Sequence, residues 1–169
     1  MKIHYHLTEE DFVNFNLYHS RHSKAASKAL KMQRFISPIL FMAAAFLFSK
    51  MGEIPLPISL STFGVMSILW VLFYPKYFYQ LIKRNAKKMI KEGKNDGLLG
   101  DHKMMMTDEG IVDTTSIGET RVSWSGITQW KEDAHYFYLY NSAVSAYILP
   151  KRELEDFEKT KAFLQAKIN

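Results

Sequence analysis

The chain has 169 residues, a formal net charge of +5 and no cysteine. Without cysteine it has no disulfide, no thiolate metal ligand and no cysteine nucleophile. The positive charge is unevenly distributed, because residues 95–169 hold eight basic and twelve acidic side chains, a balance of −4. A nucleic-acid-binding domain would carry its basic surface on its folded part, so we expect no nucleic-acid partner.

The first segment, residues 2–7, alternates Ile3, Tyr5 and Leu7 with polar residues. This period of two is typical of a half-buried strand, and such a strand needs a sheet to pair with, so we expect it to join the C-terminal part of the chain. Thr8 then opens the sequence Thr-Glu-Glu-Asp, a capping-box pattern that predicts the start of a helix. Residues 1–34 are therefore interpreted as a strand followed by an amphipathic helix.

Two apolar runs follow, residues 35–49 and 54–74, with only four residues between them. Each run approaches the roughly 20 apolar residues that cross a bilayer, which predicts a transmembrane hairpin over residues 35–78. The alternatives are a soluble protein with two buried core helices and a cleaved signal peptide, but the first run starts late and a second follows it directly. Neither run contains a charged residue or histidine, which argues against a transporter acting alone.

Basic residues flank the hairpin on both outer sides. Five lie between residues 21 and 34 and seven between 76 and 94, whereas the turn holds one lysine and one glutamate. The positive-inside rule then predicts a multi-pass membrane protein with both termini in the cytoplasm.

Residues 79–101 are interpreted as a basic helix and a linker. Five of its cations are predicted to contact anionic membrane lipid: Lys83, Arg84, Lys87, Lys88 and Lys91. The alternative is that these cations only set the topology during insertion.

Residues 102–169 contain six strand-like runs and a final helical pattern. The runs cover residues 102–107, 111–115, 119–124, 127–131, 135–140 and 143–149, and the helical pattern covers 152–167. Regular turn signals between the runs predict an antiparallel meander closed by a C-terminal helix, which resembles the pleckstrin-homology (PH) architecture. The strand at residues 2–7 would supply a seventh strand. The predicted fold class is therefore a membrane α+β protein: a two-helix transmembrane hairpin with a cytoplasmic PH-like antiparallel sheet closed by a C-terminal helix.

Several segments resemble the YcxB-like family of bacterial membrane proteins. They are Tyr5 to Phe12, Thr107 to Ile111, Val122 to Trp124 with Ile127, and Tyr138 to Tyr140 with Ala146 to Arg152, together with the double crossing. The resemblance covers essentially the whole chain. It implies an architecture and brings no catalytic residues with it.

The candidate chemistry is sparse. His4 with His6 and His19 with His22 have spacings that suit a shared metal ion, but no carboxylate or cysteine completes a ligand set, so we predict no metal and no cofactor. Ser123 lacks the flanking glycines of a nucleophile elbow. These patterns predict a protein that is not an enzyme.

The leading hypothesis is a non-enzymatic protein of the bacterial inner membrane, whose hairpin anchors a cytoplasmic PH-like domain that binds a protein partner or a lipid headgroup. The predicted partner surface is the aromatic strand, with His135, Phe137, Tyr138 and Tyr140. The alternative is an immunity (self-protection) protein whose partner is an envelope-acting toxin or bacteriocin. No pattern indicates the oligomeric state.

Overall fold

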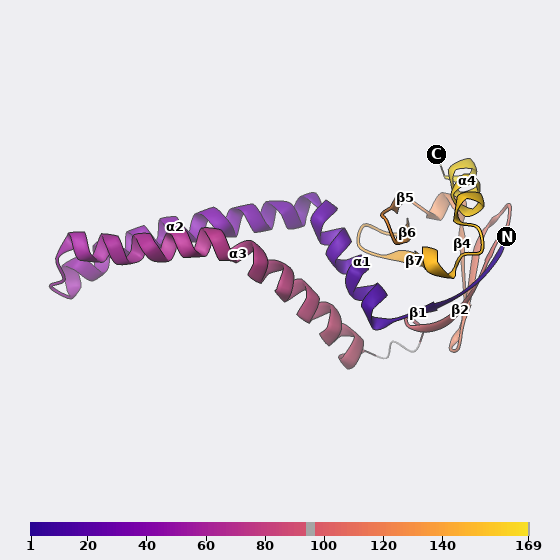
Figure 1. Cartoon of the computed structure of the whole chain (residues 1–169), viewed down its shortest axis with the longest axis horizontal. Helices are drawn as coiled ribbons and strands as arrows, with labels where there is room; N and C mark the ends of the chain where they lie inside the picture. The colour runs from indigo at the N-terminus through magenta and orange to yellow at the C-terminus, as the bar shows by residue number, and fades with distance from the viewer. Residues whose placement is uncertain (94–96, 169) are drawn as a thin grey trace. The chain divides into compact units, whose positions relative to one another are not determined.

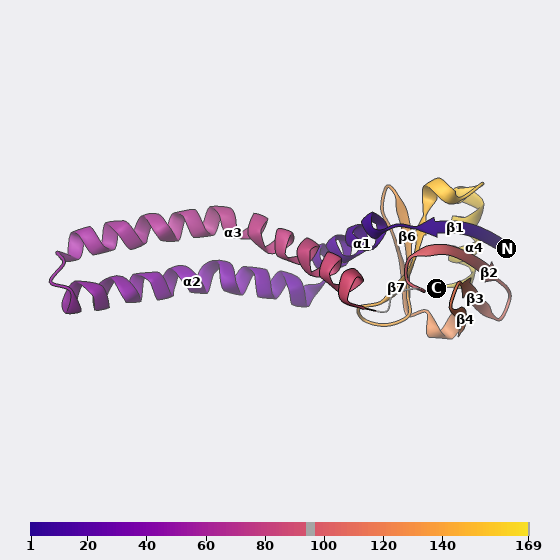
Figure 2. The same cartoon turned by 90° about the horizontal axis from the view of Figure 1, so that it is seen from below.

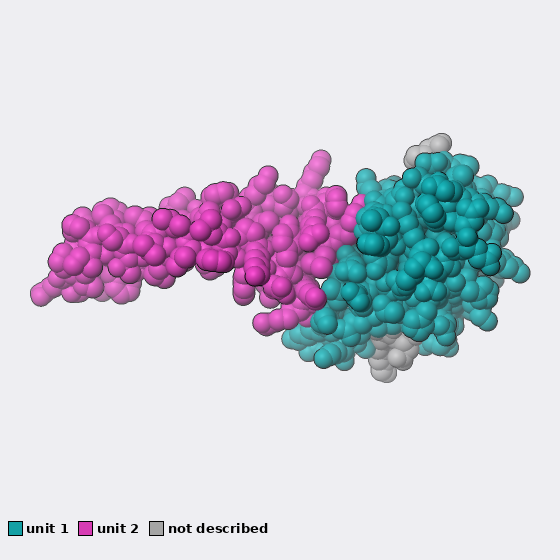
Figure 3. All heavy atoms as spheres, in the orientation of Figure 1, with its two compact units in different colours: residues 1–16, 86–169 teal, residues 17–85 magenta. Residues whose placement is uncertain are grey.

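A computed structural model describes residues 1–93 and 97–168 of the chain. The chain divides into two compact units. Unit 1 combines the two ends of the chain, residues 1–16 and 86–169, and unit 2 comprises residues 17–85 (Figure 3). The sequence pattern groups residues 1–34 together, whereas the structure assigns the first sixteen residues to the same unit as the C-terminal part. Residues 94–96 of the predicted linker lie outside the described residues.

The helix that follows the first strand is shorter than predicted. Helix α1 comprises Glu9–His22, and helix α2 comprises Lys24–Met51. Between them Ser23 is extended, and its hydroxyl accepts a hydrogen bond from the backbone N–H of Ala26 at 3.3 Å. Because Ser23 caps a new helix, the predicted continuous helix is two helices.

The predicted membrane spans lie in α2 and in helix α3, residues Leu56–Glu92. Both helices are long and apolar enough to cross a membrane, with 28 and 37 residues. At 1.5 Å per residue α2 is about 42 Å long, which exceeds a bilayer core of about 30 Å. Pro38 lies inside α2 and Pro75 inside α3, and neither proline ends its helix. Figure 1 shows α2 and α3 as long helices joined by a short turn.

Small residues hold α2 and α3 together in unit 2. The hydroxyl of Ser59 donates a hydrogen bond to the carbonyl of Ala45 at 2.7 Å, and both residues are buried. Nearer the other end of the pair, Arg34 Nε donates to the carbonyl of Val71 at 2.9 Å. Small side chains allow two backbones to approach closely, and Ser59 and Ala45 make such a contact within this antiparallel pair.

The N-terminal strand is part of a sheet built mainly by the C-terminal half of the chain. Strands β1 (Lys2–Leu7), β2 (Gly100–Met106), β3 (Gly110–Thr115) and β4 (Gly118–Ser123) form one antiparallel sheet in that order (Figure 2). Along the β1–β2 pair, Ile3 lies opposite Met104 and Tyr5 opposite His102. The predicted pairing of residues 2–7 with the C-terminal part is therefore confirmed.

A second sheet follows a short 3₁₀ turn at Trp124–Gly126. Strands β5 (Gln129–Glu132), β6 (Tyr136–Tyr140) and β7 (Ala146–Pro150) form it, again antiparallel and in chain order. All six predicted strands exist, but they belong to two sheets and not to one continuous meander.

The C-terminal helix α4 spans Phe157–Lys167. It begins five residues later than predicted, because Lys151–Glu153 form a separate 3₁₀ turn and Asp156 caps the helix through a hydrogen bond from the Lys159 N–H at 2.9 Å. Its Leu164 is fully buried in unit 1. The core of this unit also contains fully buried side chains from both sheets: Met104, Met106, Ile111, Phe137, Tyr138, Leu139 and Leu149.

Candidate functional site

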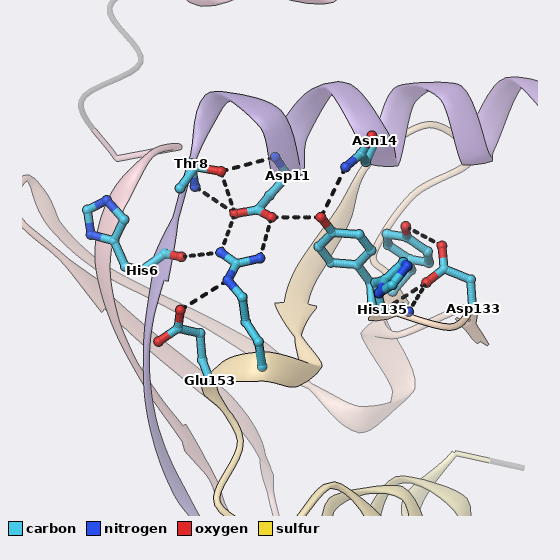
Figure 4. A network of polar contacts seen from close by, with 10 residues as sticks. His6, Thr8, Asp11, Asn14, Asp133, His135 and Glu153 are labelled. Atoms are coloured by element: carbon cyan, nitrogen blue, oxygen red, sulfur yellow. Dashed lines mark hydrogen bonds and ion pairs between the residues drawn. The ribbon is translucent and has the colours of Figure 1, made fainter.

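Unit 1 contains two polar sites, and the first is centred on the carboxylate of Asp11 (Figure 4). Asp11 is 1% exposed and lies in the first turn of α1. Its Oδ2 accepts hydrogen bonds from the backbone N–H and the hydroxyl of Thr8, at 2.8 and 2.7 Å, and the Asp11 N–H donates back to the Thr8 hydroxyl at 3.2 Å. This reciprocal pattern confirms the predicted capping box.

The same carboxylate receives donors from distant parts of the chain. Arg152 binds it with both terminal nitrogens, at 2.7 and 2.8 Å, and the Tyr136 hydroxyl donates to Oδ1 at 2.8 Å. Burial alone would raise the Asp11 pKa, but the hydrogen bonds from Arg152, Thr8 and Tyr136 outweigh it and hold the pKa well below its usual range. The hydrogen bond to Asp11 likewise raises the pKa of Arg152.

These contacts make the Asp11 site a structural connection. The carboxylate has donors from the start of α1, from β6 and from the turn after β7, so its acceptor capacity is occupied. A low pKa also makes it a poor general base. The site therefore joins the two ends of the chain within unit 1.

The second polar site is a pocket in unit 1 with a volume of about 470 Å³. This volume is within the usual range of small-molecule sites, about 300–1,000 Å³. Strands β1 to β4, strand β7 and the loops beside them supply its lining. The lining residues are Tyr5, Leu7, Gly97, Leu98, His102, Asp113, Thr115, Ile117, Gly118, Glu119, Thr120, Asn141, Ser145, Ala146, Tyr147 and Ile148.

A buried His–Asp pair lies in the wall of this pocket. His102 Nδ1 is 2.9 Å from Asp113 Oδ2, and the two side chains are only 6% and 5% exposed. The Tyr5 ring stacks on the imidazole, with ring centroids 4.9 Å apart. Within the described residues His102 Nε2 and Asp113 Oδ1 are buried and have no hydrogen-bond partner.

The pocket lining also carries hydroxyl groups. The Tyr147 and Thr120 hydroxyls are 3.4 Å apart, and both residues line the pocket. Burial raises the pKa of Tyr5 well above its usual value, and the negative charge of Asp113 and the nearby Tyr147 raise it further. The Tyr5 hydroxyl therefore stays protonated at neutral pH and remains a hydrogen-bond donor.

The predicted partner surface on β6 is not presented to solvent. Phe137 and Tyr138 are fully buried and Tyr140 is 3% exposed, because β6 is the central strand of its sheet. The ring of Phe15 from α1 lies 5.6 Å from that of Tyr138, so α1 covers one face. Of the four predicted residues only His135, just before the strand, is exposed, and the structure thereby corrects the interpretation of this strand as a binding face.

The predicted lipid-contacting cations all lie on the last turns of α3 and are exposed. Lys87 forms an ion pair with Glu9 at 3.2 Å, and Lys88 forms one with Glu92 at 3.6 Å. Lys83, Arg84 and Lys91 belong to the same segment. The proposed lipid contact stays a prediction.

The two histidine pairs whose spacing suits a metal ion lie on different elements. His4 and His6 are exposed on β1, while His19 and His22 lie in the last turn of α1. Among residues 1–93 and 97–168, no group of three histidine, aspartate or glutamate side chains is arranged to hold a metal ion.

Sequence reasoning missed the His102–Asp113 pair, although a signal for it exists. His102 is in phase with the inward-facing Met104 and Met106 on β2, and Asp113 is in phase with Ile111 on β3. A polar residue in phase with buried neighbours marks an inward-facing polar group.

These features define a two-sheet antiparallel β unit with a C-terminal helix, joined in sequence to a pair of long apolar helices. Residues 107–166 match the YcxB-like protein family, which confirms the predicted resemblance for β3 to β7 and nearly all of α4. No curated protein and no solved structure was found to match the chain.

Proposed function

We propose that the chain is a non-enzymatic binding protein of the bacterial inner membrane, anchored by α2 and α3. Its unit 1 resembles a PH domain, with β1 as the seventh strand, and binds a lipid headgroup or a protein partner in the cytoplasm. One observation carries this proposal: β1 precedes the apolar helix pair, β2 follows it, and the two strands are paired along their whole length. The pairing supports an even number of crossings, because both flanks belong to one folded unit.

The orientation rests on charge. Five basic residues precede α2's apolar run and seven follow that of α3, so the positive-inside rule favours cytoplasmic termini. Lys83, Arg84, Lys87, Lys88 and Lys91 would then lie near the inner headgroups, where anionic lipid attracts them.

The pocket favours binding as the role of unit 1. It combines apolar walls with a few convergent polar groups, which is the usual composition of a ligand site. The aromatic strand predicted to contact a partner is buried, so the pocket replaces it as the proposed recognition site.

A photo-crosslinking experiment tests this proposal in cells. A photoreactive amino acid replaces Ile117, which lines the pocket and is 68% exposed, and the matched control carries it at the exposed Gln165 on α4. We expect a discrete lipid or protein adduct at position 117 that is absent at position 165. We also expect the protein to stay in the membrane after alkaline extraction. Release by alkali would refute the anchor, and identical patterns at both positions would refute a specific site. An adduct with a toxin, together with loss of protection on deletion, would identify the immunity alternative.

A further inference from the structure

A basic groove lies in unit 2, where α1 ends and α2 begins. Its volume is about 730 Å³, and residues on both sides of the helix break at Ser23 line it. The lining that the structure describes holds no carboxylate and four basic side chains: Arg21, Lys24, Lys28 and Lys31. These are four of the five cations that precede the first apolar run, so the groove gathers most of that basic segment in one place.

The positive charge of the groove is not neutralised within its unit. Residues 17–85 contain nine basic residues and one acidic residue, Glu53, which lies beyond the other end of α2. Among residues 1–93 and 97–168, no ion pair involves Lys24, Lys28 or Lys31. Like charges four residues apart on a helix repel each other, so an anion in the groove would relieve this repulsion.

The same face of α2 becomes apolar directly after the lysines. Residues three or four apart share a face of a helix, and this series runs Lys24, Lys28, Lys31, Phe35 and Ile39. Phe35 and Ile39 are both exposed. A polyanion without an apolar part, such as a nucleic acid, would leave these two side chains uncovered. A phospholipid matches the whole face, because its phosphate suits the lysines and its acyl chain suits the apolar stripe.

The groove also lies at the level expected of lipid headgroups. Lys31 precedes Phe35, the first residue of the apolar run, by about one helical turn, or about 6 Å along the axis. Arg21 lies over the ring of Tyr79 on α3, with its guanidinium carbon 5.4 Å from the ring centroid. Tyrosine is enriched at the membrane interface, so this contact places the other wall of the groove at the same level.

We propose that this groove binds an anionic phospholipid of the leaflet on the side of the chain termini. The phosphate contacts Lys28 and Lys31, and an acyl chain runs along Phe35 and Ile39. This inference rests on the membrane anchor of the proposed function, and it adds a lipid site on a different helix from the cations at the end of α3. One lysine near an anionic surface strengthens binding by about fivefold, so the groove distinguishes anionic from neutral lipid.

The test uses the full chain in nanodiscs made of equal amounts of phosphatidylglycerol and phosphatidylcholine. A photoreactive amino acid replaces Met32, which lines the groove, and the matched control carries it at Met51, at the opposite end of the same helix. Mass spectrometry identifies the cross-linked lipid. We expect phosphatidylglycerol adducts to exceed phosphatidylcholine adducts by about fivefold or more at position 32, and to equal them at position 51.

Two triple variants test whether the lysines cause this preference. Replacing Lys24, Lys28 and Lys31 with glutamine should bring the adduct ratio at position 32 close to that at position 51. Replacing the same three with arginine keeps the charge and should keep the preference. Raising the salt concentration from about 0.1 to 0.5 M should lower the ratio in the wild-type chain, which gives a second measurement if the glutamine variant does not insert.

The outcomes separate this inference from the proposed function. Equal adduct ratios at positions 32 and 51, or an unchanged ratio in the glutamine variant, would overturn the lipid site in the groove. Lipid adducts would still form at both positions in that case, so the membrane anchor would stand. No lipid adduct at either position, together with release of the protein by alkali, would refute the anchor and this inference with it.

Discussion

Asp11 shows how one side chain links residues that are far apart in the sequence. Its carboxylate accepts hydrogen bonds from Thr8, three residues away, and from Arg152, 141 residues away. The Arg152 contact uses two parallel N–H groups, the geometry in which arginine–carboxylate pairs are strongest. The first donor fixes the start of α1, and the second fixes α1 against the turn after β7.

We predict that Asp11→Asn lowers the free energy of unfolding of unit 1 by about 2–4 kcal/mol, because it removes the buried charge that Arg152 binds with two hydrogen bonds. Urea unfolding of the full chain in mild detergent measures this change. Glu119→Gln is the matched control: it breaks the exposed Glu119–Arg121 pair at 2.7 Å and should cost less than about 0.5 kcal/mol. Equal losses in the two variants would show that Asp11 is not a special connection.

Asp11 also predicts how stability depends on pH. Its pKa is lower in the folded protein, because the hydrogen bonds to the carboxylate outweigh the opposing effect of burial, so its contribution is complete above the unfolded pKa, about 3.9. The contribution is then lost as pH falls toward the lower folded pKa. Wild-type unit 1 should therefore lose stability below about pH 4 more steeply than Asp11→Asn. Urea midpoints measured between pH 6 and 3 test this, and parallel curves would contradict it.

Only the local half of the Asp11 site could be predicted from the sequence. The Thr8–Asp11 capping box follows a fixed spacing of three residues, so the sequence pattern contains it. Arg152 and Tyr136 approach through the tertiary fold, and a single sequence carries no signal for such distant pairs. The same reasoning applies to His102 and Asp113: strand alternation indicates that each faces inward, but not that they meet.

At the level of elements, β1 is an outer strand of its sheet and buries one face. Ile3, Tyr5 and Leu7 are 7%, 4% and 3% exposed, while the intervening residues are exposed. The Met1 ammonium also donates to the carbonyl of Met106 at 2.7 Å, which extends the contact with β2. The sheet thus depends on a strand that is almost a hundred residues away from its neighbour in the sequence.

We predict that Ile3→Asp destabilises unit 1 by about 3 kcal/mol, because it places a charge on the buried face of β1 opposite Met104. His4→Asp is the matched control: it adds a charge to the neighbouring position on the exposed face, opposite Lys103. Hydrogen exchange of the β2 and β3 amides reports the effect directly. Unchanged exchange in Ile3→Asp would mean that unit 1 is stable without β1.

The strands were predictable because turn residues and alternation are local. The buried state of β6 was indicated too, since Tyr136 to Tyr140 are all apolar or aromatic without alternation, which is typical of a strand covered on both faces. The division into two sheets was not predictable, because the 3₁₀ turn at Trp124–Gly126 depends on tertiary contacts. One of these is the hydrogen bond from the Trp124 ring N–H to the Thr107 carbonyl at 3.0 Å.

At the level of the whole molecule, the cations at the end of α3 differ in the ion pairs that they form. Lys87 and Lys88 already have acidic partners, so Lys83, Arg84 and Lys91 are the better candidates for lipid contact. We predict that replacing these three with glutamine reduces the anionic lipid retained on the purified protein, because each cation near a charged surface contributes about 1 kcal/mol. Lipid mass spectrometry after purification in mild detergent measures the ratio of anionic to neutral lipid.

A second triple variant with the same charge change is the control for this prediction. It replaces three exposed lysines of unit 1 outside α3, Lys103, Lys131 and Lys159, with glutamine. An equal fall in both triple variants would assign the effect to net charge, and no fall in either would leave the α3 cations with a role only in setting topology.

The proposed membrane topology rests on the distribution of charge over the whole chain, and the absence of cysteine makes it simple to test. We predict that an impermeant thiol reagent labels Met51→Cys in intact spheroplasts and labels Val144→Cys only after lysis, because positive residues are retained on the cytoplasmic side. Met51 and Val144 are 84% and 70% exposed, so both thiols would be accessible. Met51 is preferable to the adjacent Gly52, where a new Cβ would lie only 3.0 Å from the Phe48 carbonyl. Labelling of Val144→Cys with protection of Met51→Cys would reverse the orientation. If both sites were protected until lysis, α2 and α3 would not expose their connecting turn outside the membrane.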